Sequence, residues 1–483
     1  MVTVTVIAPP PPHELKREFT FRSTFSLAFA FISPIIGLYT IFALALGTAG
    51  PAFWMGFAVV LGGQLLVALM LAELASVWPL AGGLYKWTQR LAGARLGWAA
   101  GWAYIWTLIV LVTAQCYAAA PFLASLLGFD GPDTRVLLVL SAAILLLSTA
   151  VNWLGPRALK LFVAISISAE LLGSVVIGTI LLVFFRELPL SAVFGGDGGT
   201  GAAVAPMLGA VALIGWSFIG FESAGDIAEE VEQPERAVPR ALVLSLVIVA
   251  LIVMYAALAL ILAVPNLGAA MSGATADPIS ATITTHLGEA VANPLFAMVV
   301  LAFVAGIAAV QAAVSRVIFA LARDGELPAA ASLSRLSGPD HLPRNALNAS
   351  AVAAAAFLLV TLNDNAYATL LAMATVGFYI SFAFPVICVL RNRMRGSWTC
   401  GVWNIGRFGA VVNVLAACWL VFEIVNIAWP RLPDSAWYVN YGAVSVVVLV
   451  TLGGVVTRVA MRRPEPGVAP VREGLALEPG ASR

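Results

Sequence analysis

Charged side chains are scarce in this sequence. Only 11% of its 483 residues are Asp, Glu, Lys or Arg, and 61% are hydrophobic, whereas an ordinary soluble domain carries roughly 25% charged residues. So little charge excludes a large water-exposed surface. Apolar runs of about 20 residues, enough to cross the hydrocarbon core of a bilayer, recur along the chain. We therefore predict an all-α integral membrane protein whose surroundings are the lipid bilayer.

Residues that usually hold metals or cofactors are also few. The four cysteines and three histidines lie far apart, without CxxC or another metal-binding spacing, so we predict no metal, no cofactor and no disulfide framework. The absence of GxxxxGK[ST] argues against an ATP-driven pump, and 196-GDGGTG-201 matches GxGxxG without a preceding strand. The net charge is +1 and no basic cluster occurs, so nucleic acid is not a predicted partner.

Twelve apolar stretches are predicted to be transmembrane helices. With the N-terminus in the cytoplasm, every Lys and Arg except Arg135, Arg186 and Arg431 falls in a cytoplasmic segment, as the positive-inside rule requires. Both termini are therefore predicted to be cytoplasmic, in a plasma or inner membrane, with tails over 1–22 and 461–483. The predicted spans lie near 23–47, 52–78, 98–122, 135–153, 159–185, 204–231, 239–264, 293–321, 346–362, 366–390, 408–428 and 438–460.

Two of these spans are interrupted by glycine or proline. The first reads 31-FISPIIGLYTIF-42 and the sixth reads 215-GWSFIGFE-222. Either interruption alone could be a simple kink, but a matching pair in two halves of the chain is typical of inverted-repeat transporters. Unwound backbone is costly in lipid unless it faces a cavity. The pair therefore predicts a solute-binding site at mid-membrane.

Four carboxylates follow the second interruption within a few residues. Glu222 is predicted to open the half-helix after the break, where the helix dipole favours a negative charge. Asp226 and Glu229 follow at i+4 and i+7, so we expect all three on one face toward the cytoplasm. The alternative for Glu229, Glu230 and Glu232 is a hydrated helix end at the membrane interface.

Four stretches resemble the amino acid–polyamine–organocation (APC) superfamily, and most closely its amino acid/choline/GABA permease branch. They are 32-ISPIIGLYTIF-42, 72-AELASVWPLAGGLYKW-87, 215-GWSFIGFESAGDIAEEVEQPERAVPRAL-242 and 316-RVIFALARDGELP-328. The resemblance implies a LeuT-like fold in which a ten-helix core, 23–390, contains inverted repeats over about 23–185 and 204–390. Two further helices, 391–460, would be appended to that core.

The resemblance also implies roles for individual residues. Trp216 matches an aromatic gate near the substrate, and Glu222 matches an acidic residue just beyond the unwound segment. Leu38 and Tyr39 stand where many relatives carry Ser-Gly, so a hydroxyl for a substrate carboxylate is missing and ω-amino acids and amines stay open. The predicted substrate-binding residues are Ile35, Ile36, Gly37, Leu38, Tyr39, Gln115, Trp216, Phe218, Ile219, Gly220, Phe221 and Gln311, with the first break at Ile36 and Gly37.

Several polar residues inside other spans are candidates for coupling or gating. Glu170 lies deep in the fifth span, where an ionisable group is a functional candidate; it carries a proton or makes a structural hydrogen bond to a Ser or Thr. Ser315 lies one turn from Gln311, and because a sodium site wants several oxygens, this single hydroxyl favours protons.

Charged groups at the cytoplasmic ends of the spans form a second set of candidates. Glu73, Arg316, Arg323 and Asp324 are predicted to form an inner ion-pair gate, or else to be interfacial charges. Glu423, outside the ten-helix core, is predicted to make a packing or oligomer contact. Most aromatic side chains, such as Trp102, Tyr104 and Trp106, are predicted to be interfacial anchors.

The sequence thus predicts a secondary active transporter rather than an enzyme. It would move a small amino acid or related amine such as GABA by alternating access, with Glu222, Asp226 or Glu170 handling a coupling proton. The alternatives are an obligate exchanger and a membrane sensor that lost transport. The protein is expected to be a monomer or a homodimer.

Overall fold

The computed structural model describes residues 15, 17–129, 132–195, 204–275, 277–362, 366–431 and 437–461. The 196-GDGGTG-201 run, most of the N-terminal tail and the C-terminal tail beyond Met461 lie outside these residues. Within the described ranges every regular element is a helix. The predicted twelve spans are confirmed, because twelve helical stretches are long and apolar enough to cross a membrane.

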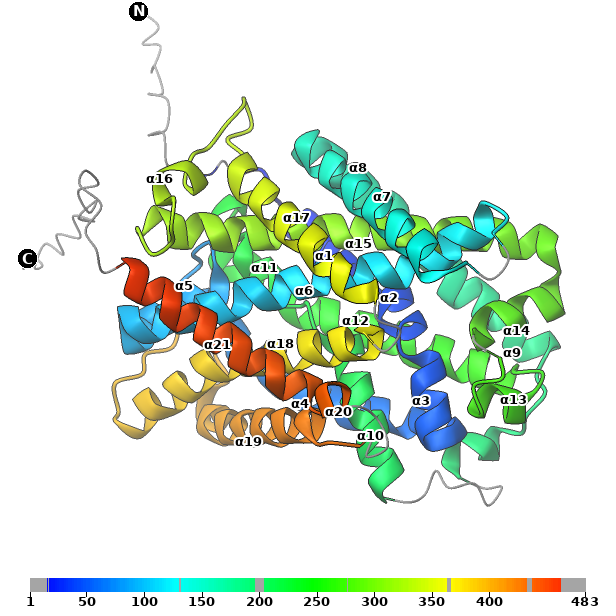
Figure 1. The fold of residues 1–483 in the computed structure, drawn as a ribbon. Coiled ribbons are helices and arrows are strands. Elements are labelled where there is room, and N and C mark those ends of the chain that lie inside the picture. Colours follow the sequence, from blue (N-terminus) through cyan, green and yellow to red (C-terminus); the bar gives the residue numbers. More distant parts are fainter. Residues whose placement is uncertain are drawn as a thin grey trace, which may run out of the picture.

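The helices follow one another as Figure 1 shows. Their bounds are α1 Phe21–Ile32, α2 Pro34–Tyr39, α3 Phe42–Ala49, α4 Trp54–Val77, α5 Gly83–Ala92, α6 Ala94–Leu126, α7 Thr134–Trp153, α8 Pro156–Leu171, α9 Gly178–Phe184, α10 Val204–Ile214, α11 Ser223–Asp226, α12 Pro234–Leu262, α13 Leu267–Met271, α14 Pro278–Leu287, α15 Glu289–Arg323, α16 Ala330–Leu333, α17 Arg344–Leu358, α18 Ala366–Met394, α19 Gly409–Ala428, α20 Trp437–Asn440 and α21 Gly442–Met461.

Burial separates central helices from peripheral ones. The apolar windows of α6 and α15 are each 78% buried, whereas that of α21 is 6% buried. α6 packs against α15 and α18, and α4 packs against α12, which places these long helices at the centre. A helix that is apolar all round and exposed, such as α21, is suited to face lipid. The chain is therefore a multi-pass membrane protein with α19 and α21 at its edge.

The first interruption lies at Ser33, between α1 and α2. Ser33 has φ 48, and its hydroxyl accepts a hydrogen bond from the Ile36 N–H at 3.1 Å. The cause is local, since a residue before proline is disfavoured in helical conformation and Pro34 is a good first residue for the next helix. The predicted break at Ile36 and Gly37 is wrong in position, because both residues lie within α2.

The second interruption lies between α10 and α11, as predicted. A 3-10 turn over Gly215–Phe218 is followed by extended Ile219 and by Gly220 at φ 106. α11 then has only four residues, and a separate 3-10 turn contains Glu229. The prediction that Glu222, Asp226 and Glu229 share one helix face is therefore wrong for Glu229.

Candidate functional site

The two interrupted spans contact each other directly. The Ser217 hydroxyl donates to the Gly37 carbonyl oxygen at 2.6 Å, across 180 residues of chain. A Cβ on Gly37 would lie 3.2 Å from the Ser217 carbonyl oxygen, so the close approach depends on glycine. Ser217 was not among the predicted residues, because a serine in an apolar run gives no sign of its partner.

Glu170 lies at the first interruption. Its carboxylate accepts hydrogen bonds from Ser33 at 2.7 Å and from Ser166 at 2.8 Å, and the Ile35 backbone also bonds to it. The side chain is fully buried. The structural serine partner considered for Glu170 is thus present, and so is contact with the break. A π-helical turn, Leu172–Ile177, follows directly, and such turns are frequent at functional sites.

Glu222 and Asp226 meet at a single phenol after the second interruption. The Tyr104 hydroxyl lies 3.0 Å from Glu222 Oε1 and 2.8 Å from Asp226 Oδ2, and all three residues are buried. Glu222 Oε2 also accepts from the Gly220 N–H at 3.0 Å. A phenol has one proton, so both contacts are hydrogen bonds only if one carboxyl carries a proton.

Tyr104 corrects a prediction from the sequence. It was assigned to the interfacial aromatic residues together with Trp102, yet it is fully buried in α6. Its ring packs edge-on against Phe378 of α18 at 6.0 Å. Trp102 and Tyr104 are adjacent on different faces of one helix, and only tertiary packing distinguishes them.

Two aromatic side chains of the second interruption pack on helices other than α2. The Phe218 ring packs on Phe57 of α4 at 5.8 Å, and the Phe221 ring packs on Phe382 of α18 at 5.4 Å. Trp216 is buried as well. The backbone of Ile219 and Gly220, which is not helical, therefore carries the polar groups of this segment that could bind a solute.

The remaining predicted substrate residues fall into two groups. Tyr39 packs on Phe122 at 5.9 Å, and Gln115 is buried with its Oε1 lacking a hydrogen-bond partner among the described residues. Gln311, by contrast, donates to Thr149 at 2.8 Å on α7. Its amide thus has a partner on a helix outside the two interrupted spans.

Ion pairs gather at the end of the bundle where α5, α15 and α18 meet, here called the charged end, on the left of Figure 1. Arg316 makes a two-point contact with Glu230, at 2.8 and 3.2 Å, and both are buried. The hydrated helix end considered for Glu229, Glu230 and Glu232 is therefore wrong for Glu230, whereas Glu229 is half-buried and Glu232 is exposed. The ion pairs among the described residues are Lys86–Asp324, Arg316–Glu230, Arg323–Glu229, Arg393–Glu73 and Arg458–Glu326.

The residues predicted for an inner gate are thus in ion pairs, although not all with one another. Glu73 pairs with Arg393 of α18, and Arg316 pairs with Glu230 just after span six. Tyr85 of α5 donates to Asp324 beside Lys86. Burial and the charge of Asp324 raise the pKa of the Tyr85 phenol, so this hydroxyl remains a donor.

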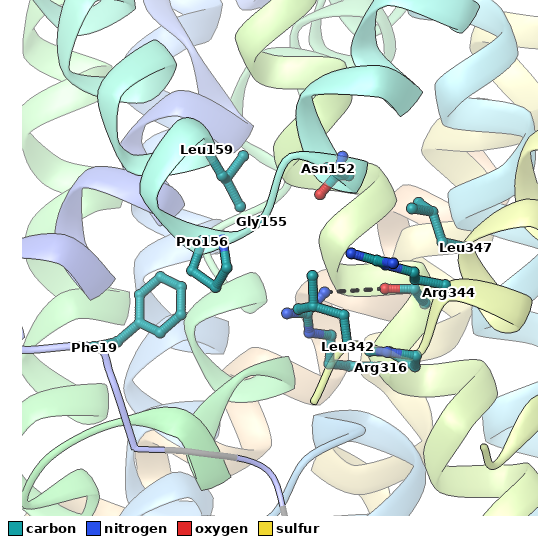
Figure 2. Close-up of a pocket in the computed structure, with 11 residues that line it drawn as sticks. Phe19, Asn152, Gly155, Pro156, Leu159, Arg316, Leu342, Arg344 and Leu347 are labelled. Carbon is teal, nitrogen blue, oxygen red and sulfur yellow. Dashed lines mark hydrogen bonds between the residues drawn. The ribbon is translucent and has the colours of Figure 1, made fainter. Parts of the chain in front are cut away.

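A small pocket lies beside Arg316 at the charged end. Figure 2 shows Phe19, Pro156 and Leu159 on one side of it and Arg316, Arg344 and Asn152 on the other. Its volume is about 10 Å³, which is at most enough for one water molecule. The Phe19 segment also bonds to the Glu230 backbone at 2.9 Å. The space beside Arg316 is therefore almost filled in this structure.

Replacing Arg316 with Gln is expected to destabilise the protein by about 3–5 kcal/mol, because it leaves Glu230 buried and unpaired. Adding Glu230→Gln should recover much of that loss, since two neutral amides replace the buried pair. Thermal unfolding in detergent measures both. Equal melting temperatures for wild type and Arg316→Gln would contradict a buried ion pair.

Sequence comparison decides which family these features belong to. A model of the amino acid permease family matches residues 23–452. The chain belongs to the amino acid permease family. Permeases are transporters rather than enzymes, and this family lies within the superfamily that the sequence resembles.

Named relatives of this permease come from plants, fungi and bacteria. The amino-acid permease BAT1 of Arabidopsis thaliana is 25% identical over 472 residues, which cover 91% of this chain and 90% of the relative. Amino-acid permease 2 of Neurospora crassa is 28% identical, with 89% and 82% covered. The branched-chain amino acid permease BcaP of Lactococcus lactis subsp. cremoris is 27% identical, with 68% and 72% covered.

Proposed function

We propose that this permease is a secondary active transporter of a small amino acid or a related amine such as GABA, driven by protons through alternating access. The observation that supports this most is the contact between two interrupted spans, with buried carboxyls at both breaks. The proposal includes a LeuT-like arrangement, with inverted repeats over 23–185 and 204–390 and appended helices over 391–460. The relatives' names favour an amino acid over the amines, and one relative takes branched-chain amino acids.

We place the substrate between α2 and the Ile219–Gly220 backbone. Carbonyl oxygens of the unwound segment are suited to accept hydrogen bonds from an ammonium group. A substrate carboxylate would compete with Glu170 for the Ser33 hydroxyl and the Ile35 backbone, the groups that Glu170 now occupies. Ser33 thereby supplies the hydroxyl whose absence at Leu38 left amines open, and this supports an amino acid.

Competition at Ser33 suggests how a proton is coupled to the substrate. A protonated Glu170 no longer opposes a second carboxylate at the same donors, so proton and substrate enter together. At the other break, Glu222 and Asp226 hold a shared proton through Tyr104, and Glu222 is also hydrogen-bonded to the Gly220 N–H. Proton uptake and movement of the interrupted spans are then linked through the hydrogen bonds of Glu170 to Ser33 and of Glu222 to Gly220.

We place the two gates of the proposed site in two layers of side chains, which alternating access requires to open in turn. The charged end forms one layer, which the positive-inside pattern assigns to the cytoplasm together with both termini. The other is an aromatic cluster in which Phe122 contacts Tyr39, Phe296 and Phe303 at 5.9, 6.1 and 6.4 Å. Substrate exchange on either side requires one layer to open while the other stays closed.

Replacing Glu170 with Gln is expected to remove the pH dependence of substrate affinity and to abolish concentrative uptake, while exchange of substrate across the membrane persists. The amide keeps the size of the side chain and one acceptor oxygen but cannot release a proton. Binding titrations across a pH series measure this. Glu187→Gln, the same change on an exposed residue, is the control. Unchanged pH dependence in Glu170→Gln would assign coupling elsewhere.

A thermal-stability screen of the purified protein tests the substrate proposal. The panel comprises branched-chain and other α-amino acids, GABA and other ω-amino acids, choline, ethanolamine and polyamines. A ligand that binds only the folded state raises stability with concentration. We expect a saturable shift with one amino acid class. Cooperative melting without any shift would contradict the proposed substrate class.

A further inference from the structure

Glu423 is a further carboxyl buried within the membrane spans, and it lies on α19, outside the two interrupted spans. It is fully buried inside the monomer, so the oligomer contact considered for it is wrong. Its Oε1 accepts from Asn426 at 3.3 Å, while its Oε2 has no hydrogen-bond partner among the described residues. A buried acceptor without a partner is uncommon and needs an explanation.

The neighbouring helices bring further unsatisfied polar atoms to the same region. α19 packs against α4 and α18, and both amide atoms of Gln64 and the Tyr379 hydroxyl lack partners within the described chain. The Gln64 amide approaches this hydroxyl, and Glu423 lies within electrostatic range of it. Both Gln64 and Tyr379 are fully buried. We call Gln64, Tyr379 and Glu423 the Glu423 cluster.

The cluster touches the second interruption. A Cβ on Gly215 would lie 3.0 Å from the Tyr379 hydroxyl oxygen. Gly215 opens the 3-10 turn that leads to Ile219 and Gly220. On its other side, Asn426 connects the cluster to Arg431 after α19, which donates to the Asn426 carbonyl at 2.6 Å. Polar groups thus extend from the end of α19 to the back of the second break.

Few charged groups face Glu423 from the elements packed around α19. α10 has no ionisable residue, and those of α4, α18 and α21 lie toward the charged end, where several are in ion pairs, apart from Tyr379 and from Tyr367, which packs on Tyr117 at the other end of α18. Arg431 is the nearest cation, but its described hydrogen bonds go to Asn426 and Trp429. The groups that face Glu423 are Gln64, Tyr379, Asn426 and Arg431.

We propose that the Glu423 cluster is a further proton-binding site, hydrated by at least one water molecule, that contacts the second interruption through Gly215. Water supplies the partners that Gln64, Tyr379 and Glu423 lack, and a proton that reaches the site from bulk solvent through that water neutralises the carboxylate. Protonation converts one acceptor oxygen of Glu423 into a donor, and so changes the hydrogen bonding of Gln64 and Tyr379 beside Gly215. The site itself does not depend on the proposed transport activity, but its effect on the spans does.

Infrared spectroscopy of the purified protein tests this site without any substrate. A protonated carboxyl absorbs apart from carboxylates, so subtracting the Glu423→Gln spectrum from wild type isolates Glu423. We expect one titrating carboxyl band that Glu187→Gln retains and Glu423→Gln loses. Exchange into D2O should shift the band promptly, because the site is hydrated. Identical wild-type and Glu423→Gln spectra across the pH series, or a band insensitive to D2O, would overturn the proposal.

Tyr379→Phe provides a second variant in case Glu423→Gln does not fold. It keeps the ring and removes the hydroxyl, so the Glu423 band should shift in frequency. An unshifted band would show that Tyr379 is not part of the site. If the band behaves as expected but no variant and no wild-type protein transports amino acids against a gradient, the proposed function fails and this site stands.

Discussion

Replacing Glu222 with Gln is expected to lower the rate of proton-driven uptake at least tenfold, the equivalent of about 1.4 kcal/mol in the barrier. The amide keeps the size of the side chain and one acceptor oxygen, which serves either Tyr104 or the Gly220 N–H, but it cannot exchange a proton with Asp226. Folding should therefore survive while coupling is lost. Uptake in proteoliposomes under an imposed pH gradient measures the effect, with thermal unfolding as the check on folding.

Tyr104→Phe tests the bridge between the two carboxyls while both carboxyls stay in place. It leaves Glu222 and Asp226 buried without their common partner, so we expect lower stability as well as slower uptake. Glu187→Gln is again the matched control and should transport at the wild-type rate. Wild-type uptake with unchanged pH dependence in Glu222→Gln would place the coupling proton elsewhere.

Replacing Gly220 with Ala is expected to abolish transport and to destabilise the protein strongly. At φ 106 a side chain is strained, at about 1–3 kcal/mol, and its Cβ would lie 2.2 Å from the Phe31 ring. Either Phe31 of α1 or the unwound segment must move. Because these are the two interrupted spans, the substitution disturbs the proposed site directly. Thermal unfolding and ligand-induced stabilisation measure both effects.

Gly62 in α4 offers a matched control for this substitution. A Cβ there meets no atom within 4 Å, and alanine is favoured over glycine in a helix by about 1 kcal/mol. Gly62→Ala should therefore melt at the same temperature or higher and transport normally. If Gly220→Ala melts like Gly62→Ala and still binds substrate, the unwound geometry at Gly220 is not required.

Much of the architecture could be predicted because membrane spans depend on local composition. Twelve spans followed from apolar length alone, and Pro34, Gly215 and Gly220 marked the two interruptions because their effect on the backbone is local. The family resemblance correctly pointed to an amino acid permease. The depth of Glu170 and Glu222 in apolar sequence was enough to single them out as candidates.

The partners of these residues could not be predicted, because they come from other helices. Nothing near Ser33 in the sequence indicates Glu170, and nothing near Tyr104 indicates two carboxyls 118 and 122 residues away. The pairing of Glu230 with Arg316 depends equally on how span six ends against α15. Short 3-10 turns also change the face on which a residue such as Glu229 lies, and helical periodicity does not predict them.

The most direct test of the account is amino acid uptake into proteoliposomes with an imposed proton gradient, using the amino acid selected by the stability screen. We predict saturable accumulation above the external concentration that collapses when a protonophore is added and is lost in Glu222→Gln. Uptake that occurs only against preloaded substrate, with no response to the proton gradient, would contradict proton coupling and identify an exchanger.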